Sequence, residues 1–386
     1  MKQRRIPGRI LLWIIIILSA ANALIVLTDN TYLYKAFYYN FADIDDARLF
    51  ANRRIPNGTP EEWPLGNNYN KILVPANLIK TLENYQSVAF LVIKNDSVRY
   101  EKYWEGYGPD SASSSFSMAK SFVGVLTGIA IAEGKIKNVD QPAGDFLPEF
   151  REGEKSKITI RHLLTMSSGL EWNESYANPF SVTTRIYYGH DLRKTVATLP
   201  VVSPPGKVFK YSSGDTQVLS LVVAAATGEH LAEYASEKLW KKIGAVHPAS
   251  WSLDKNDGDE KAYCCFNSNA RDFARIGKLF MNKGKWGNEQ VVPEDYVKAS
   301  LTPAGLVNNE GFPVNYYGYS WWLLPAFKGH DIFYARGILG QYIFVIPDES
   351  MIVVRLGHKR NSKKRNFHPA EVFDYLDGTM DMFTGK

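Results

Sequence analysis

Hydrophobic and polar positions first show a β pattern near residue 90. Val88–Lys94 and Val98–Trp104 are rich in β-branched and aromatic residues and flank Asn95-Asp96, a dipeptide that favours tight turns. The spacing predicts a β-hairpin. Alternating or continuous apolar runs return near the C-terminus and predict a meander of strands, at Tyr317–Leu324, Ile332–Ala335, Gln341–Ile346 and Met351–Leu356.

Between these two β regions the apolar residues recur at helical spacing. The most apolar helix is predicted from Phe116 to Glu133, and Gly134 follows it as a C-terminal stop. Further predicted helices are Leu219–Ala226, Leu231–Ile243, a segment capped by Asn269 and ended by Gly284, and a last helix over about Pro369 to Phe383.

This order of elements predicts an α/β plus all-α fold. An antiparallel sheet, made by N-terminal and C-terminal strands together, carries a helical subdomain at about residues 116–254. We expect an anchor or signal over residues 1–30, a linker that wraps onto the domain over 31–85, and one catalytic domain over 86–386.

The N-terminus carries an export signal. Ile10–Leu27 is an apolar run just long enough to cross a bilayer, and the basic residues Lys2, Arg4, Arg5 and Arg9 precede it. This charge asymmetry predicts that the rest of the chain lies outside the cytoplasm. We favour an uncleaved anchor, because the apolar run continues past the alternative cleavage site at Ala21-Asn22-Ala23.

Composition excludes several other classes. The 386 residues carry a net charge of +5 that is spread along the chain, which does not indicate nucleic-acid binding. The 7 His and 2 Cys form no cluster with metal-ligand spacing, so no metal and no cofactor is expected. The cysteines, Cys264 and Cys265, are neighbours and are interpreted as small buried hydrophobic residues, since a bridge between them is strained.

The cations near the C-terminus form one cluster. Lys359-Arg360 and Lys363-Lys364-Arg365 lie between the last predicted strand and the last helix. We interpret this segment as a solvated loop, with attraction to anionic lipid as the alternative.

The candidate chemistry begins at Ser117, where the most apolar predicted helix starts. Ser117 and Lys120 form a Ser-x-x-Lys motif, and positions i and i+3 of a helix share a face. A serine hydroxyl needs an adjacent base, and a lysine that is neutral in a buried site can serve. The motif recurs at Ser252–Lys255, in a polar context that predicts a loop without a catalytic role.

Further segments follow in a characteristic order. After Ser117 come Ile158–Leu170, then Tyr211-Ser212-Ser213, then Gly337–Gln341. With these motifs the chain resembles the serine β-lactamase and penicillin-binding-protein superfamily, in particular its class C-like branch. That branch also holds carboxylesterases, D-amino peptidases and 6-aminohexanoate-dimer hydrolases. The resemblance implies the β-lactamase/transpeptidase-like fold.

The resemblance implies a role for each matching residue. Ser117 would be the nucleophile, Lys120 and Tyr211 would act as general base and acid, and an acyl-enzyme would form without any cofactor. Backbone N–H groups of Ser117 and Ile338 would make the oxyanion hole. Gly337 and Ser213 would belong to the oxyanion and substrate-binding part of the site.

Two departures affect the expected substrate. Ala335 stands where these enzymes usually carry a cation, and Ser213 replaces the usual Asn. Both changes favour a hydrolase of small amides or esters, like the 6-aminohexanoate-dimer hydrolases and the esterases. A bulge of the strand at Arg336 would oppose this interpretation, because its guanidinium would then turn into the cleft and restore the cation. The alternatives are a penicillin-binding D-alanyl peptidase or β-lactamase, and a non-catalytic membrane-tethered sensor. The sequence does not indicate an oligomeric state.

Overall fold

The computed structural model describes residues 8–384, and Lys2, Arg4 and Arg5 of the basic N-terminal flank lie outside them. Its centre is a six-stranded antiparallel sheet with the strand order β11-β12-β13-β14-β2-β3. The strands are β2 (Ser87–Lys94), β3 (Ser97–Tyr103), β11 (Trp322–Phe327), β12 (His330–Gly337), β13 (Gln341–Ile346) and β14 (Met351–Gly357).

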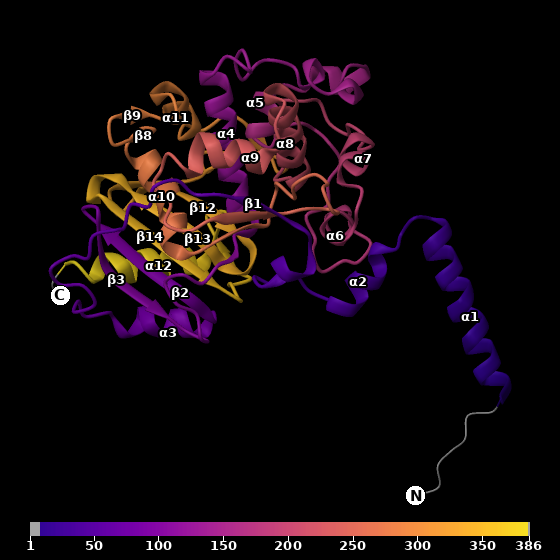
Figure 1. Ribbon diagram of the computed structural model, residues 1–386, viewed down its shortest axis with the longest axis horizontal. Coiled ribbons are helices and arrows are strands. Elements are labelled where there is room, and N and C mark those ends of the chain that lie inside the picture. The colour runs from indigo at the N-terminus through magenta and orange to yellow at the C-terminus, as the bar shows by residue number, and fades with distance from the viewer. Residues whose placement is uncertain (1–7, 385–386) are drawn as a thin grey trace, which may run out of the picture.

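The sheet joins the two ends of the catalytic region, as the sequence predicts. The N-terminal hairpin β2–β3 pairs with β14, with Val92 opposite Val353. Asn95 and Asp96 form the hairpin turn with φ of 52° and 56°, because a two-residue turn of this hand needs positive φ at both positions. Figure 1 shows these segments side by side, although they are far apart in the sequence.

Helices cover both faces of the sheet, so its strands are apolar on both sides. Val92, Phe344 and Val353 pack in the core beneath α3 (Ala76–Asn84) and α12 (Ala370–Asp381). Their neighbours along the strands face α10 (Ala270–Met281) and the helical block. The N-cap of α10 is Asn269, as predicted, and its side chain accepts a hydrogen bond from the Asp272 N–H.

A second group of α-helices forms a block beside the sheet (Figure 1). They are α4 (Ala119–Ala132), α5 (Ile160–Leu164), α6 (Val182–Tyr188), α7 (Leu192–Ala197), α8 (Ser213–Thr227), α9 (Leu231–Ala235) and α11 (Glu294–Ser300). A small four-stranded sheet lies against this block, in the order β1 (Asn52–Ile55), β6 (Ala249–Ser252), β7 (Phe266–Ser268) and β4 (Ser113–Ser114). Two-residue strands complete the fold: β5 (Val208–Phe209), β8 (Lys285–Trp286), β9 (Glu289–Gln290), β10 (Val307–Asn308), β15 (Lys364–Arg365) and β16 (His368–Pro369).

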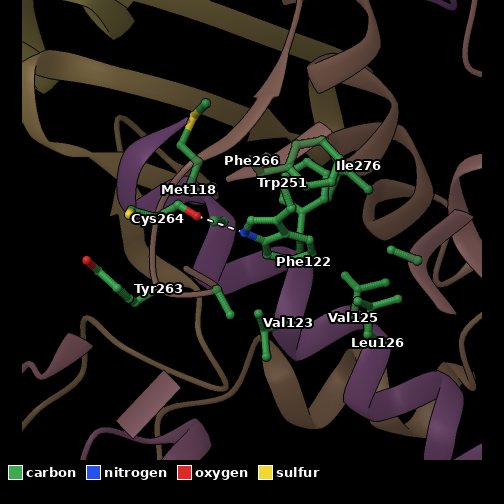
Figure 2. Close-up of a cluster of buried hydrophobic side chains, with 14 of the residues drawn as sticks. Met118, Phe122, Val123, Val125, Leu126, Trp251, Tyr263, Cys264, Phe266 and Ile276 are labelled. Carbon is green, nitrogen blue, oxygen red and sulfur yellow. Dashed lines mark hydrogen bonds between the residues drawn. The ribbon is translucent and has the colours of Figure 1, made fainter. Parts of the chain in front are cut away.

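The helix α4 lies at the centre of the block. Its residues from Ala119 to Ala130 are all buried, which explains why this helix is the most apolar one of the domain. Figure 2 shows Phe122 of α4 beside Phe266 and Trp251, and the rings of Phe122 and Phe266 stack with centroids 4.4 Å apart. The same contacts fix the start of α4, where the candidate nucleophile lies.

Several predicted element boundaries are wrong. The strand predicted from Tyr317 begins only at Trp322, because Ser320 adopts a left-handed φ of 59° and interrupts the extended backbone. The helix predicted over Leu231–Ile243 ends at Ala235 and continues as a π turn, Ser236–Trp240.

The prediction that the two cysteines are unpaired is also wrong. Cys264 and Cys265 form a disulfide between neighbouring residues. Cys265 has a φ of 66°, so the backbone turns sharply there and the two side chains can meet. Both residues are buried, as predicted.

The N-terminal helix α1 (Gly8–Leu27) extends away from the body of the molecule (Figure 1). It has a mean hydropathy of 2.8 and no buried residue, so it is long and apolar enough to cross a membrane. The next helix, α2 (Tyr32–Tyr39), packs on α6 and buries Tyr32, Leu33 and Ala36.

Candidate active site

Ser117 lies on a short turn rather than inside a regular helix. The 3-10 turn Phe116–Met118 immediately precedes α4, and Phe116 adopts a φ of 43° that is rare for a residue with a side chain. Ser117 is 6% exposed and lines a cleft of about 630 Å³. The strained turn therefore presents the serine at the floor of an open cleft.

Lys120 points at Ser117 from the first turn of α4. Its Nζ donates to Ser117 Oγ at 2.9 Å, to Ser213 Oγ at 2.8 Å and to the backbone oxygen of Tyr263 at 3.0 Å. The side chain is 1% exposed. Burial, together with the charge of Arg336, lowers the pKa of Lys120 to about 8, against the opposing charges of Glu174 and Asp215.

Ser213 and Glu174 extend the hydrogen-bond network that holds Lys120. Ser213 begins α8, and its hydroxyl accepts from Lys120 and donates to Glu174 Oε1 at 2.5 Å. Glu174 also accepts from the Ser213 N–H at 2.9 Å and from Trp172 Nε1 at 2.6 Å. The Ser213 hydroxyl therefore lies between the lysine and a carboxylate, and Ser213 is not among the residues that line the cleft.

Tyr211 lines the cleft next to Ser117. The centroid of its ring is 5.1 Å from Lys120 Nζ, and the ring packs on Trp322 with centroids 5.4 Å apart. Burial raises the pKa of Tyr211 well above its ordinary value, with a further rise from Glu174. The phenol is therefore neutral near pH 7 and can donate a proton.

Gly337 and Ile338 form the edge of the cleft at the end of β12. A Cβ atom at Gly337 would lie 2.4 Å from the backbone oxygen of Ser115 and 3.0 Å from Phe116 Cβ. Only glycine allows this close approach of β12 to the turn that carries Ser117. The contact brings the backbone of Ile338 to the same cleft as the serine.

Positive charge also lines the cleft. Arg336 lies on β12, and its guanidinium carbon is 3.3 Å from the centroid of the Trp322 ring. Strand side chains alternate, so Arg336 faces the cleft while Ala335 faces the core. The cleft thus contains a cation, one residue after the position where the sequence shows none.

The basic segment near the C-terminus borders the same cleft. Arg360, Lys363 and Lys364 all line it, together with Phe367. The sequence alone predicts a solvated loop here. The side chains are exposed, but Lys364 belongs to the short strand β15 rather than to a loop. Their place beside Ser117 depends on how the chain returns from β14 to α12, which no local pattern indicates.

The second Ser-x-x-Lys motif lies away from the cleft. Ser252 ends strand β6, is 1% exposed and donates a hydrogen bond to Asn52 Oδ1 at 2.7 Å. The prediction of a loop is wrong for Ser252, because β6 pairs with β1. Lys255 does not contact Ser252 through any hydrogen bond in the described part of the chain.

Sequence reasoning misses two contributors to the site. Glu174 comes from an irregular segment without a motif, and Tyr263 contributes a backbone oxygen, which leaves no signature in the sequence.

Outside the cleft, Asp43, Asp45 and His358 also come within reach of one another and could hold a metal ion.

The fold and the site together define the class of protein. A model of the family described as Beta-lactamase matches residues 76–377, and the chain belongs to this family. It is a family of serine hydrolases, and its fold is the β-lactamase/transpeptidase-like fold that the sequence predicts.

The chain is also similar to individual proteins of this family. A 6-aminohexanoate-dimer hydrolase of Paenarthrobacter ureafaciens is 28% identical over 317 residues, covering 78% of this chain and 80% of the relative. Esterase EstB of Burkholderia gladioli is 30% identical over 162 residues, 37% of this chain and 41% of the relative. A solved structure described as "Putative 6-aminohexanoate-dimer hydrolase from Bacillus anthracis" has a TM-score of 0.75 at 21% identity, covering 90% of this chain and 93% of that one.

Proposed function

We propose that the protein hydrolyses a small amide or ester through an acyl-enzyme on Ser117. The observation that carries this proposal is the hydrogen bond of 2.9 Å between Ser117 and a buried lysine whose pKa is lowered to about 8. A lysine with such a pKa is partly neutral near pH 7 and can accept the serine proton.

The proposed reaction has two halves. Lys120 takes the proton of Ser117 while Oγ attacks the carbonyl carbon, and the N–H groups of Ser117 and Ile338 stabilise the oxyanion. Tyr211 gives its proton to the leaving amine or alkoxide and regains one from Lys120. Water then attacks the acyl carbon and passes a proton to Lys120. Lys120 returns this proton to Ser117 Oγ as the bond between Oγ and the acyl carbon breaks and the acid is released.

In this scheme Ser213 and Glu174 are positioning residues. Ser213 holds the Lys120 amine by accepting one of its hydrogen bonds, and Glu174 fixes the direction of the Ser213 hydroxyl. Ser213 therefore acts on the base rather than on the substrate.

The favoured substrates are simple esters and short linear amides like those of the named relatives. The rival is a β-lactam or D-alanyl peptide, and one observation favours it, because Arg336 places a cation in the cleft. Comparing kcat/KM for p-nitrophenyl butyrate, an aminohexanoate-type linear amide and a chromogenic cephalosporin separates these classes. Efficient cephalosporin hydrolysis that is lost in Arg336→Ala would favour the rival.

The nucleophile is tested by ester turnover of two serine variants. Ser117→Ala should lose on the order of 10⁴-fold or more in kcat. Ser252→Ala, the control from the second motif, should keep the activity of the native protein. Equal activity of Ser117→Ala and the native protein would contradict the proposal, and background turnover in every form would indicate a non-catalytic role.

We further propose that α1 is an uncleaved anchor that holds the catalytic domain outside the cytoplasm. Next to α1, helix α2 exposes Phe37 and Tyr38, and Phe41 and Phe180 are exposed nearby. Aromatic side chains are typical of the membrane–water interface. Sequencing the N-terminus of the mature protein tests this, since a soluble form beginning at Leu24 would show that α1 is a cleaved signal.

A further inference from the structure

The cleft has one wall made of cations. We define the cationic wall as Arg336, Arg360, Lys363 and Lys364, which all line the cleft that contains Ser117. The only carboxylate that lines this cleft in residues 8–384 is Glu174, and its oxygens already accept from Ser213 and Trp172.

The cations of the wall have no acidic partner. None of the four takes part in an ion pair within the described part of the chain. The Nη1 atom of Arg336 is buried and has no hydrogen-bond partner there. A buried donor without a partner is costly, so a ligand that accepts from Arg336 would stabilise this arrangement.

The cations also lie close enough to repel one another. Burial lowers the pKa of Lys364, and the charges of Arg336 and Arg360 lower it further, whereas Glu310 opposes this. Glu371 interacts with the charge of Arg360 but forms no ion pair with it in residues 8–384; its Oε1 accepts from the Tyr342 hydroxyl at 2.7 Å. An anion in the cleft would remove the repulsion between the cations, whereas a neutral ligand would leave it.

We propose that the cationic wall binds an anionic group of the substrate, so that the preferred substrate is an acyl compound carrying one or more carboxylates or phosphates. This inference rests on the proposed hydrolase function and specifies its substrate class. Arg336 supplies a planar donor that packs on Trp322, and the three exposed side chains of the basic segment supply further positive charge.

The test uses esters that are matched except for charge. Mono-p-nitrophenyl glutarate is compared with p-nitrophenyl valerate for the acyl side, and 4-butyryloxybenzoate with phenyl butyrate for the leaving-group side. In at least one pair the anionic ester should have a kcat/KM higher by on the order of tenfold to hundredfold, as expected for a charge-assisted hydrogen bond. Added salt should reduce this ratio.

Two triple variants distinguish the effect of the cationic wall from the effect of the protein's net charge. Replacing Arg360, Lys363 and Lys364 by Gln should lower the ratio clearly, although Arg336 remains as the last cation of the wall. The control replaces Lys80, Lys135 and Lys137, which are exposed and outside the cleft, and changes the net charge equally. The control should keep the ratio of the native protein, and equal ratios in both variants would overturn the proposal.

A binding measurement keeps the two proposals distinguishable. Calorimetric titration of the Ser117→Ala protein with glutarate should show binding that the wall variant loses. If the native protein hydrolyses none of these esters, neutral or anionic, the proposed function fails while this titration still decides the anion site. If it hydrolyses neutral esters but shows no preference in either pair, only the anion site is wrong.

Discussion

The floor and the wall of the cleft are built in opposite ways. On the floor, Lys120 is buried and donates to three acceptors, and Ser213 and Glu174 extend this network by further hydrogen bonds. On the cationic wall, by contrast, three of the four charges are exposed and none has an acidic partner in residues 8–384. The polar groups of the floor are satisfied within the protein, whereas the charges of the wall have no acidic partner within the described residues.

We relate this difference to two tasks, proton transfer on the floor and substrate selection on the wall. Proton transfer requires a base held at hydrogen-bond distance with a pKa near the working pH, which the buried network provides. Selection among substrates can act over a longer range, through charge that is satisfied only when the right ligand is present. We therefore expect changes on the floor to affect kcat strongly and changes on the wall to affect the choice of substrate.

The largest effect is expected from Lys120→Met, which keeps the volume of the side chain and removes the base. We expect kcat for p-nitrophenyl butyrate to fall by about 10²–10⁴-fold, the range typical of general base catalysis. The matched control is Lys261→Met, because Lys261 is also fully buried with a pKa lowered to about 7, but it donates to the Ile186 oxygen outside the cleft. Similar losses of kcat in both folded variants would contradict the role of Lys120.

A smaller effect is expected from Gly337→Ala at the edge between floor and wall. The new Cβ would lie 2.4 Å from the Ser115 oxygen and would push β12 away from the Ser117 turn. We expect a loss in kcat of about 10²-fold, comparable to the loss of one oxyanion-hole donor. Gly108→Ala serves as the control, since a Cβ at Gly108 has no heavy atom within 4 Å. An unchanged kcat in Gly337→Ala would show that this contact does not position the site.

The smallest effects are expected in the pH dependence, where floor and wall act on Lys120 in opposite directions. Activity should rise with pH through about 8 as Lys120 loses its proton. The charge of Glu174 raises the pKa of Lys120 and the charge of Arg336 lowers it. Glu174→Gln should therefore move the midpoint to lower pH and Arg336→Gln to higher pH, with changes in rate at pH 7 below roughly tenfold.

These shifts are measured from kcat/KM for the neutral ester between pH 5 and 10. A midpoint that moves in the same direction in both variants would contradict the assignment of the rising limb to Lys120.

The sequence predicts the elements that follow from local periodicity and fails where distant segments meet. The hairpin β2–β3, strand β13 and the central helix α4 follow from their patterns, and the family motifs identify Ser117, Lys120 and Tyr211 as candidates. Glu174 could not be predicted, because only the tertiary fold brings it to Ser213. The roles of all these site residues, and the division of the chain into domains, stay predictions.

The charge in the cleft follows only in part from the sequence, for a related reason. Ala335 suggests that the site lacks a cation, but the side-chain alternation of β12 turns Arg336 toward the cleft, and the return of the chain to α12 adds the basic loop. The bridge between Cys264 and Cys265 also escapes prediction, because it depends on the left-handed φ of Cys265.

The central claim, that Ser117 forms the acyl-enzyme, is tested most directly by covalent labelling. The native protein is treated with a fluorophosphonate, digested and mapped by mass spectrometry. We predict a single adduct on the peptide that contains Ser117, with no labelling of Ser117→Ala and undiminished labelling of Ser252→Ala. An adduct on another residue, or persistent labelling of Ser117→Ala, would contradict the account.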